Sequence, residues 1–483
     1  MTETDILQAD ARGATYEWIG AGAIAVAAGV AVGLAADPLA VSLVVPVGVA
    51  GAALLGRTTT AVVVLLACLA AISGLATRIG ALSGLLHIGV LLLAVIRVLQ
   101  EAPSARRRWL GAPWLGWGYA LFVLAMLASV AVSVDSLQSL RSFVRFCAPL
   151  ALYYVVYSVA REDSAARQRV QWALGLSVLV PLLVGAAQMV GGGETVQAAD
   201  LEADSPGGGG YEWTRFHSTF EHPNAFAAFL AVTLPFLIAV WRLDPVRWRR
   251  RVWLTLMGAG TLELLLGQVR SAWIAAVVGV LVFLAVNRRL SVTKRVLWVV
   301  AVVVGLALLT QTSIVRSRVA DLFASPVQTL LTQDVFEGGA RSSLHTRIWL
   351  WINAAGLIRD RPVLGWGIGT WYSQLATATL QGFSLHSDYV HAAVETGLVG
   401  LAAFLMLRVS LLRAALGGIG TGKDEDGNQL ASAALGCVCA VCLLGITESV
   451  FFAYSAVEWY VWGIMGCAQA ALRPLVPLSG SVG

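Results

Sequence analysis

Apolar stretches long enough to cross a membrane recur along almost all of this 483-residue chain, and no other feature limits its fold as strongly. An α-helix needs about 20 apolar residues to cross a hydrocarbon core about 30 Å thick. The chain is 58% hydrophobic and only 13% charged, about half the charged fraction of a typical soluble domain. We therefore predict an all-α polytopic membrane protein with about 12–14 transmembrane helices. Windows of about 19 residues place its spans at 18–36, 38–55, 60–77, 80–98, 115–133, 141–160, 170–190, 222–241, 252–268, 271–287, 295–311, 388–410, 431–450 and 455–472.

The connections between these spans alternate in charge. "RVLQEAPSARRR", "REDSAARQR", "RLDPVRWRRR" and "NRRLSVTKR" are rich in arginine and lysine, whereas residues 191–213 carry five acids and no base. Because cytoplasmic loops carry the excess of basic residues, we predict that both chain termini are cytoplasmic and that the connections 191–220 and 312–387 lie outside. The chain then divides into N-terminal transmembrane helices 1–210, core transmembrane helices 211–311, an outer loop 312–387 with short helices, and C-terminal transmembrane helices 388–483.

The outer loop 312–387 has an unusual charge balance. It contains six arginines and four acids, although the positive-inside trend disfavours basic residues on this side. Within it, "RIWLWINAAGLIRDRP" predicts an amphipathic helix that ends at Arg361-Pro362. An arginine excess on the outer face indicates an anionic partner, and the planar guanidinium suits a phosphoryl group because it can donate two hydrogen bonds to it.

Polar side chains that could form a site gather on the same predicted face. Two histidines and an asparagine lie at the start of the span at 222–241 or just before it. An arginine lies between two spans, further arginines lie in the outer loop, and two histidines flank the end of that loop. The set comprises Arg215, His217, Glu221, His222, Asn224, Arg270, Arg341, Arg347, Arg359, Arg361, His386, Asp388 and His391.

Several of these features also have simpler interpretations. "GWGIGTW" at 365–371 could hold a phosphate through backbone amides, but a glycine-rich turn is the favoured interpretation. Arg359 is interpreted as a contact to lipid headgroups. His391 and Glu395 have an i,i+4 spacing compatible with a metal, yet two ligands do not make a site, so no metal is predicted. The six cysteines all fall in apolar runs and are interpreted as small hydrophobic residues.

Four segments resemble one known family in their order and spacing. They are "RFHSTFEHPNAFAAFLAVTLPF", "VRSAWIAAVVGVLVFL", "RIWLWINAAGLIRDRPVLGWGIGTW" and "LHSDYVHAAVETGLVGLAAFL". Together they resemble the O-antigen ligase / O-antigen polymerase superfamily, well over about 210–410 and more loosely beyond it. Ser218 stands where that family often has glycine, and Ser387 stands in place of the asparagine after the histidine.

The resemblance implies a C-type glycosyltransferase architecture in the bacterial inner membrane, with the active site on the periplasmic side. It implies a glycan donor linked to undecaprenyl pyrophosphate, an acceptor hydroxyl, and no metal or nucleotide cofactor. By motif position, His386 would be the general base, and Arg347 and Arg270 would bind the pyrophosphate. The residues that would bind substrate are Arg215, His217, His222, Asn224, Arg341, Tyr389 and Glu395.

The acceptor stays open at this stage. A ligase would use lipid A-core, a polymerase would use another lipid-linked glycan, and a protein O-oligosaccharyltransferase would use a protein. The long outer loop favours the ligase. An anion transporter is the alternative from another class, and it would place charged residues deep in the spans, where Glu263 and Glu448 are the main examples. A binding partner among nucleic acids is not expected, because the net charge of +5 reflects the arginines at membrane faces.

Overall fold

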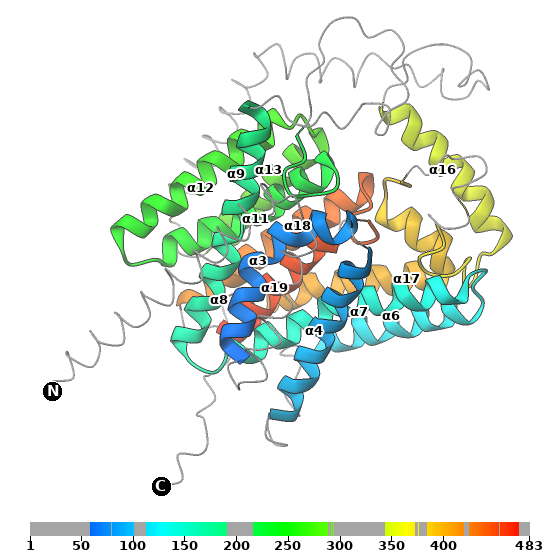
Figure 1. Ribbon diagram of the computed structural model, residues 1–483, viewed down its shortest axis with the longest axis horizontal. Coiled ribbons are helices and arrows are strands. Elements are labelled where there is room, and N and C mark those ends of the chain that lie inside the picture. Colours follow the sequence, from blue (N-terminus) through cyan, green and yellow to red (C-terminus); the bar gives the residue numbers. More distant parts are fainter. Residues whose placement is uncertain are drawn as a thin grey trace, which may run out of the picture.

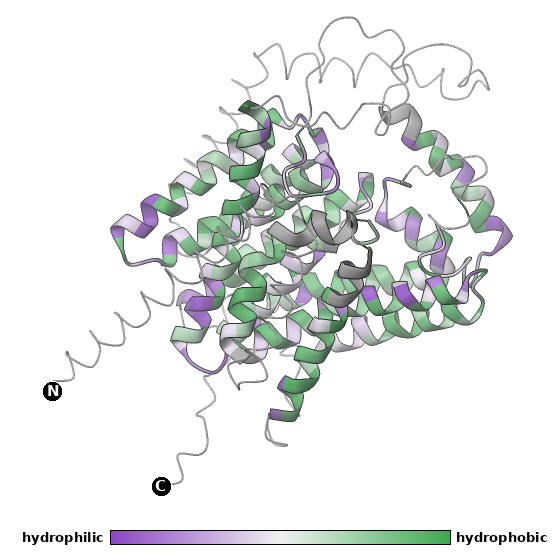
Figure 2. Cartoon of the chain, in the orientation of Figure 1, coloured by the Kyte–Doolittle hydropathy of each residue, from purple (hydrophilic) through white to green (hydrophobic). Residues whose placement is uncertain are grey.

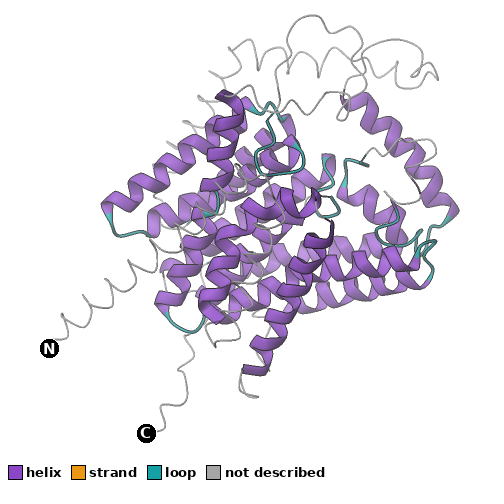
Figure 3. Ribbon diagram, viewed as in Figure 1, coloured by secondary structure: helices purple, strands orange, loops and turns teal. Residues whose placement is uncertain are grey.

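The structure is a computed structural model, and it describes residues 58–78, 80–100, 113–190, 216–287, 291, 293, 343–371, 375, 384–419, 425–453 and 455–472. These residues form helices joined by turns and contain no strand (Figure 3). The helices are α3 (Thr58–Arg78), α4 (Gly80–Gln100), α6 (Pro113–Ala131), α7 (Ser136–Val159), α8 (Ser164–Leu176), α9 (Leu179–Val190), α11 (Pro223–Leu243), α12 (Arg247–Leu266), α13 (Arg270–Val286), α16 (Ser343–Asp360), α17 (Asp388–Gly417), α18 (Glu425–Thr447) and α19 (Ser455–Ala471).

The helices form one bundle around α18 and α19 (Figure 1). In it α18 packs on α11 and α13, α19 packs on α7, and α6 pairs along its length with α17. Small residues allow the closest of these approaches, because a Cβ atom at Gly436 of α18 would lie 2.4 Å from the carbonyl oxygen of Gly279 in α13. Apolar residues cover outward faces of the bundle as well as its interior (Figure 2), as expected for helices that face lipid.

The predicted fold class is confirmed: the chain is an all-α, multi-pass membrane protein. Five described helical stretches are long and apolar enough to cross a membrane, namely 136–159, 164–190, 223–243, 388–417 and 426–447. The stretch 164–190 contains both α8 and α9. The predicted spans at 18–36, 38–55 and 295–311 lie outside the described residues, so the total of about 12–14 spans stays a prediction.

Helix α17 differs from the single continuous span predicted at 388–410, because its backbone breaks at Gly397. This residue has φ 68° and ψ −173°, a conformation essentially restricted to glycine. The amides that follow leave the helix ladder, and Leu398 donates its N–H to the carbonyl of Pro362 at 2.8 Å. Residues 388–396 and 398–417 are therefore two helical segments, and the first returns along the second.

A second, smaller apolar core lies beside the main one. We call residues 343–371, which comprise α16 and the turn that follows it, the cap. Its buried residues Leu350, Ala354 and Trp371 pack with Leu385 and Val394 rather than with the bundle core. The predicted amphipathic helix is confirmed, since α16 ends at Asp360, directly before Arg361-Pro362.

The cap contacts the bundle at both ends of α16. At one end Arg361 donates to the carbonyl of Val132 after α6, at 3.2 Å. The other end of α16 approaches the connection between α18 and α19. Arg145, nine residues (145 − 136) into α7, donates to the carbonyl of Ala453 in that connection at 3.0 Å. The α18–α19 connection is thus held against α7.

Candidate functional site

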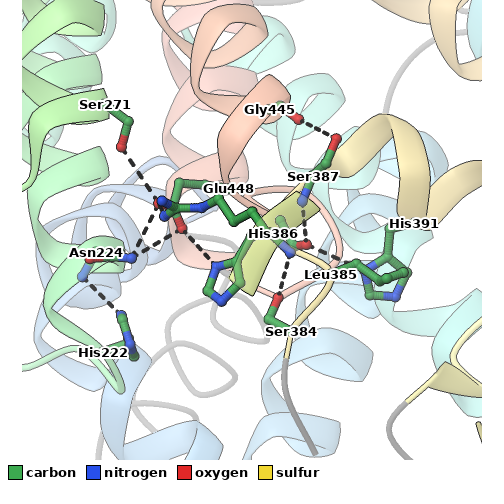
Figure 4. Close-up of polar contacts among 12 residues, drawn as sticks. His222, Asn224, Ser271, Ser384, Leu385, His386, Ser387, His391, Gly445 and Glu448 are labelled. Carbon is green, nitrogen blue, oxygen red and sulfur yellow. Dashed lines mark hydrogen bonds and ion pairs between the residues drawn. The ribbon is translucent and has the colours of Figure 1, made fainter. Parts of the chain in front are cut away.

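One buried carboxylate lies at the centre of the predicted site residues. Glu448 directly follows α18, and its side chain is 0% exposed. Arg347 Nη2 donates to its Oε1 at 2.7 Å, and Asn224 Nδ2 lies 3.2 Å from each of its oxygens. Ser271 Oγ donates to Oε1 at 3.5 Å, and His386 Nδ1 lies 3.5 Å from Oε2 (Figure 4).

Four helix starts supply the partners of Glu448, namely those of α11, α13, α16 and, through His386 just before its cap, α17. Asn224 is the second residue of α11, whose start is fixed by Pro223 and by the ring of His222, which accepts the Asn224 N–H at 3.0 Å. Ser271 lies in the first turn of α13. Arg347 lies in the first turns of α16. A buried charge in a membrane protein is costly, so this convergence of donors is what makes an ionised Glu448 tenable.

The charges around Glu448 decide its protonation state. Burial by itself raises the pKa of this carboxyl. The hydrogen bond from His386 and the positive charge of Arg347 outweigh burial and lower the pKa to about 2. Glu448 is therefore an anion at neutral pH, and it forms an ion pair with Arg347.

His386 is held in an uncommon backbone conformation. Its φ of 47° lies in the left-handed region, where non-glycine residues are rare and often functional. The next residue, Ser387, caps α17 by accepting the Val390 N–H at 3.4 Å, and its hydroxyl donates to the carbonyl of Gly445 at 3.2 Å. Serine and asparagine are both good helix caps, so Ser387 preserves the function of the asparagine that the family has here. The backbone that follows His386 is thus tied to α18 through Ser387 and Gly445 (Figure 4).

The turn at 365–371 is not a phosphate cradle, because its amides already have partners within the protein. Gly365, Gly367 and Gly369 all have positive φ, which only glycine adopts readily. Glu395 occupies the place an anion would take: its carboxylate accepts the N–H groups of Gly369 at 2.7 Å and Trp371 at 2.9 Å. His391 Nε2 lies 3.2 Å from the same carboxylate. The turn interpretation is therefore confirmed, and Glu395 fixes that turn.

Some of the other predicted site residues lie outside the described part of the chain, and the rest lie within it. Arg215 and Arg341 lie outside the described residues. Arg270 begins α13 beside Ser271 and is partly buried. His217 is buried and its Nδ1 lies 2.6 Å from the carbonyl oxygen of Phe220, while Tyr389 donates its hydroxyl to the carbonyl of Cys442 at 2.9 Å.

Ser218 explains one departure from the family pattern. Its φ is 56°, so this position has the left-handed backbone that glycine favours. Its N–H donates to Gln188 Oε1 at 2.8 Å and its hydroxyl donates to the carbonyl of Pro181 at 2.5 Å. These contacts hold the serine in a conformation that glycine would adopt without them.

Sequence reasoning did not place Glu448 in the site. From the sequence it is one of two acids deep in the predicted spans, a feature that belongs to the transporter alternative. The signal that could have found it is the cost of an acid in that position, which requires cationic partners nearby. The described residues contain no group of three or more histidine, cysteine or acidic side chains arranged to hold a metal.

A known family of proteins matches the part of the chain that contains Ser271, Arg347 and His386. Residues 256–405 match the family model described as O-antigen ligase. This confirms the resemblance to the O-antigen ligase / O-antigen polymerase superfamily. A protein of Haemophilus influenzae, described as uncharacterized, is 24% identical over 202 residues, which are 39% of this chain and 46% of the relative. The match thus spans less than half the length of that relative.

Proposed function

We propose that this chain, which matches the O-antigen ligase family model over residues 256–405, is a glycosyltransferase of the ligase type. It transfers a glycan from undecaprenyl pyrophosphate to a hydroxyl of lipid A-core at the periplasmic face of the inner membrane. The observation that carries the proposal is the meeting of Arg347, His386 and Glu448, which joins a phosphate-binding side chain to a base within one buried cluster.

The reaction breaks the bond between the anomeric carbon and a phosphate oxygen, and the electron pair of that bond leaves with the pyrophosphate. Negative charge therefore develops on the leaving group, and guanidinium groups fixed in advance stabilise it. Arg347 is fixed by Glu448, whose Oε1 accepts a hydrogen bond from Nη2 at 2.7 Å. Arg270, one residue before Ser271, is the second candidate.

The new bond forms between the acceptor oxygen and the anomeric carbon, while the acceptor proton passes to His386. Glu448 faces Nδ1 of this ring, so it favours the tautomer with the proton on Nδ1 and leaves Nε2 to accept the acceptor proton. The same carboxylate stabilises the imidazolium that results. Attack from the face opposite the leaving group inverts the anomeric configuration.

The test uses the purified full-length protein in liposomes with an undecaprenyl-pyrophosphate-linked glycan and lipid A-core. We expect transfer with inverted configuration that continues in excess EDTA. His386→Ala removes the base and should lower transfer by roughly 10²–10⁴-fold while donor binding persists. A near wild-type rate for His386→Ala would show that this histidine is only structural, and loss of transfer in EDTA would reject the arginine-based mechanism.

The acceptor is tested in the same assay. Offered lipid A-core, a second lipid-linked glycan and a serine-bearing protein separately, the enzyme should modify lipid A-core. Elongation of the lipid-linked glycan would assign a polymerase, and glycosylation of the protein would assign a protein O-oligosaccharyltransferase. An anion transporter would consume no donor in any of the three reactions.

The orientation is tested by cysteine labelling. Single cysteines in place of Ser205 and Ser325, in the two long connections predicted outside, should react with an impermeant reagent in intact spheroplasts. Labelling only after membrane disruption would reverse the topology and remove the site from the periplasmic face.

A further inference from the structure

A second group of buried charges lies behind the Glu448 cluster, and the proposed reaction does not use it. Asp388, Arg408 and Glu458 have side chains that are 1%, 4% and 1% exposed. Arg408 Nη2 lies 2.5 Å from Glu458 Oε1 and 3.5 Å from Asp388 Oδ2, and Arg408 Nη1 donates to Glu458 Oε2 at 3.2 Å. Replacing a buried ion pair by well-packed apolar residues is often neutral or stabilising, so stability alone does not explain this group.

The chain reversal at Gly397 creates this group. Asp388 and Arg408 are 20 residues apart and would lie about 30 Å apart on one straight helix. Because residues 388–396 return along 398–417, the two side chains meet. Arg408 also lies over the ring of Phe404, 4.6 Å from its centroid, and 5.6 Å from that of Phe451.

Asp388 connects this group to the site. Its Oδ1 accepts the N–H of Phe451 at 2.8 Å and that of Phe452 at 3.4 Å. These amides belong to residues 449–452, which directly follow Glu448 and which we call the 449–452 turn. The Ser387 N–H, next to His386, donates to Ser449 Oγ at 3.2 Å. The start of α17 therefore lies next to His386 and also holds the turn that follows Glu448.

We propose that Asp388 is a positioning residue that sets the distance between His386 and Glu448. One of its oxygens binds the 449–452 turn, and the other meets Arg408, which is itself held by both oxygens of Glu458. The positioning of the turn rests on geometry alone, whereas its effect on transfer rests on the proposed function.

Substitutions of Asp388 and of Glu458 should have different effects on the 449–452 turn, whereas in a purely structural group they would have the same effect. Glu458 lies on α19 and contacts Arg408, whereas Asp388 also accepts two backbone N–H groups of the 449–452 turn. Asp388→Ala loses both the ion pair and the turn contact. Asp388→Asn loses the charge but keeps an oxygen that can accept the Phe451 N–H. Glu458→Gln is the matched control, because it weakens the ion pair without touching the turn.

The test compares hydrogen–deuterium exchange and transfer kinetics of these full-length variants in liposomes. In Asp388→Ala, amides of the 449–452 turn should exchange about five- to tenfold faster, the factor for one lost hydrogen bond, while peptides of α7 and α11 keep their wild-type rates. Its kcat should fall by at least about tenfold with KM for the donor within about twofold. Asp388→Asn should fall between Asp388→Ala and wild type, and Glu458→Gln should leave exchange of the turn within about twofold of wild type.

Equal and uniform acceleration of exchange in Asp388→Ala and Glu458→Gln would overturn the proposal, because the group would then only stabilise the bundle. If Asp388→Ala does not fold, Asp388→Asn is compared with Glu458→Gln by the same criterion. Absence of transfer in the wild-type protein would reject the proposed function, while the exchange measurements would still decide whether Asp388 holds the turn.

Discussion

The bundle and the cap are built by different means, although both contribute to the same site. The bundle core consists of alanine, valine, leucine and aromatic side chains, with glycines where helices approach closely. The cap is a small cluster rich in tryptophan, in which Trp351 donates its ring N–H to the carbonyl of Leu385 and Trp366 donates to that of Leu357, both at 2.9 Å. Tryptophan suits such a place because it combines a large apolar face with one hydrogen-bond donor.

This difference assigns separate roles to the two regions. The bundle fixes His386, Asn224 and Glu448 at helix ends, and helix α16 of the cap, which packs in the smaller apolar cluster, brings Arg347 to them. The Arg347–Glu448 ion pair is therefore both part of the site and the contact that closes the cap onto the bundle. Each prediction below tests this division, starting from the largest expected effect.

Glu448→Gln should have the largest effect on stability, because it leaves Arg347 opposite a neutral group. The pKa of Glu448 lies at about 2 in the folded protein, below its ordinary value of 4.5, so the carboxylate stabilises the fold above pH 4.5. This contribution, roughly 3 kcal/mol, is lost as the pH falls from 4.5 towards 2. Thermal unfolding in detergent should show a constant gap between wild type and Glu448→Gln at pH 6–8 that narrows below about pH 4.5. A gap that is unchanged at pH 3 would contradict the assignment.

Gly397→Ala should destabilise the junction of cap and bundle by about 1–3 kcal/mol. Its φ is 68°, and an added Cβ would lie 2.2 Å from the carbonyl oxygen of Val363, a backbone atom that cannot move aside. Gly356→Ala is the control within the cap, since nothing lies within 4 Å of its Cβ position in α16. That change should stabilise the protein by up to about 1 kcal/mol. If both variants unfold at the same temperature, the break at Gly397 is not required.

Arg347→Lys should lower both donor affinity and transfer, by about tenfold, because an ammonium keeps the charge but loses the two-pronged contact. Surface plasmon resonance with the lipid-linked donor and the transfer assay measure the two effects. Arg359→Ala, which changes an exposed arginine of α16, should leave both within about twofold. Full activity of Arg347→Lys would mean that a point charge is sufficient.

Trp366→Phe should have the smallest effect, about 1 kcal/mol, since it removes the ring N–H donated to Leu357 and keeps most of the apolar contact. Limited proteolysis within residues 343–371 should become faster, with no change in the bundle. Trp248→Phe, at a side chain 62% exposed on α12, is the control and should change nothing measurable. Faster cleavage in both variants would remove the distinction between cap and bundle.

The sequence predicted the elements whose signals are local. Helix α11 begins at Pro223, α16 ends before Pro362 and α17 begins at Asp388, each as the pattern of caps and prolines indicates. The break at Gly397 was not predicted, because a single glycine in an apolar run resembles a helix interior. Its conformation depends on Pro362 and Val363, which lie 35 and 34 residues earlier in the chain.

The sequence identified most residues of the site, but it did not predict that they meet at one carboxylate. Arg347, His386 and Asn224 were identified by motif, and the structure brings them to one carboxylate. Glu448 escaped because it lies 62 residues from His386, 101 from Arg347 and 224 from Asn224, and no local pattern records such contacts. The roles of these residues in transfer stay predictions.

The charge group behind the site also has a consequence for how the protein is made. Arg408 is synthesised 50 residues before Glu458, so α17 enters the membrane before α19 exists. Until then the guanidinium lacks its two-oxygen partner at a depth where an unsatisfied charge is costly. We expect the hairpin of α17 to remain at the insertion machinery until α19 emerges and completes the ion pair. A chain truncated after α18 should therefore be retained there and removed by membrane proteases, which makes α19 the element that commits the newly made protein to its final form.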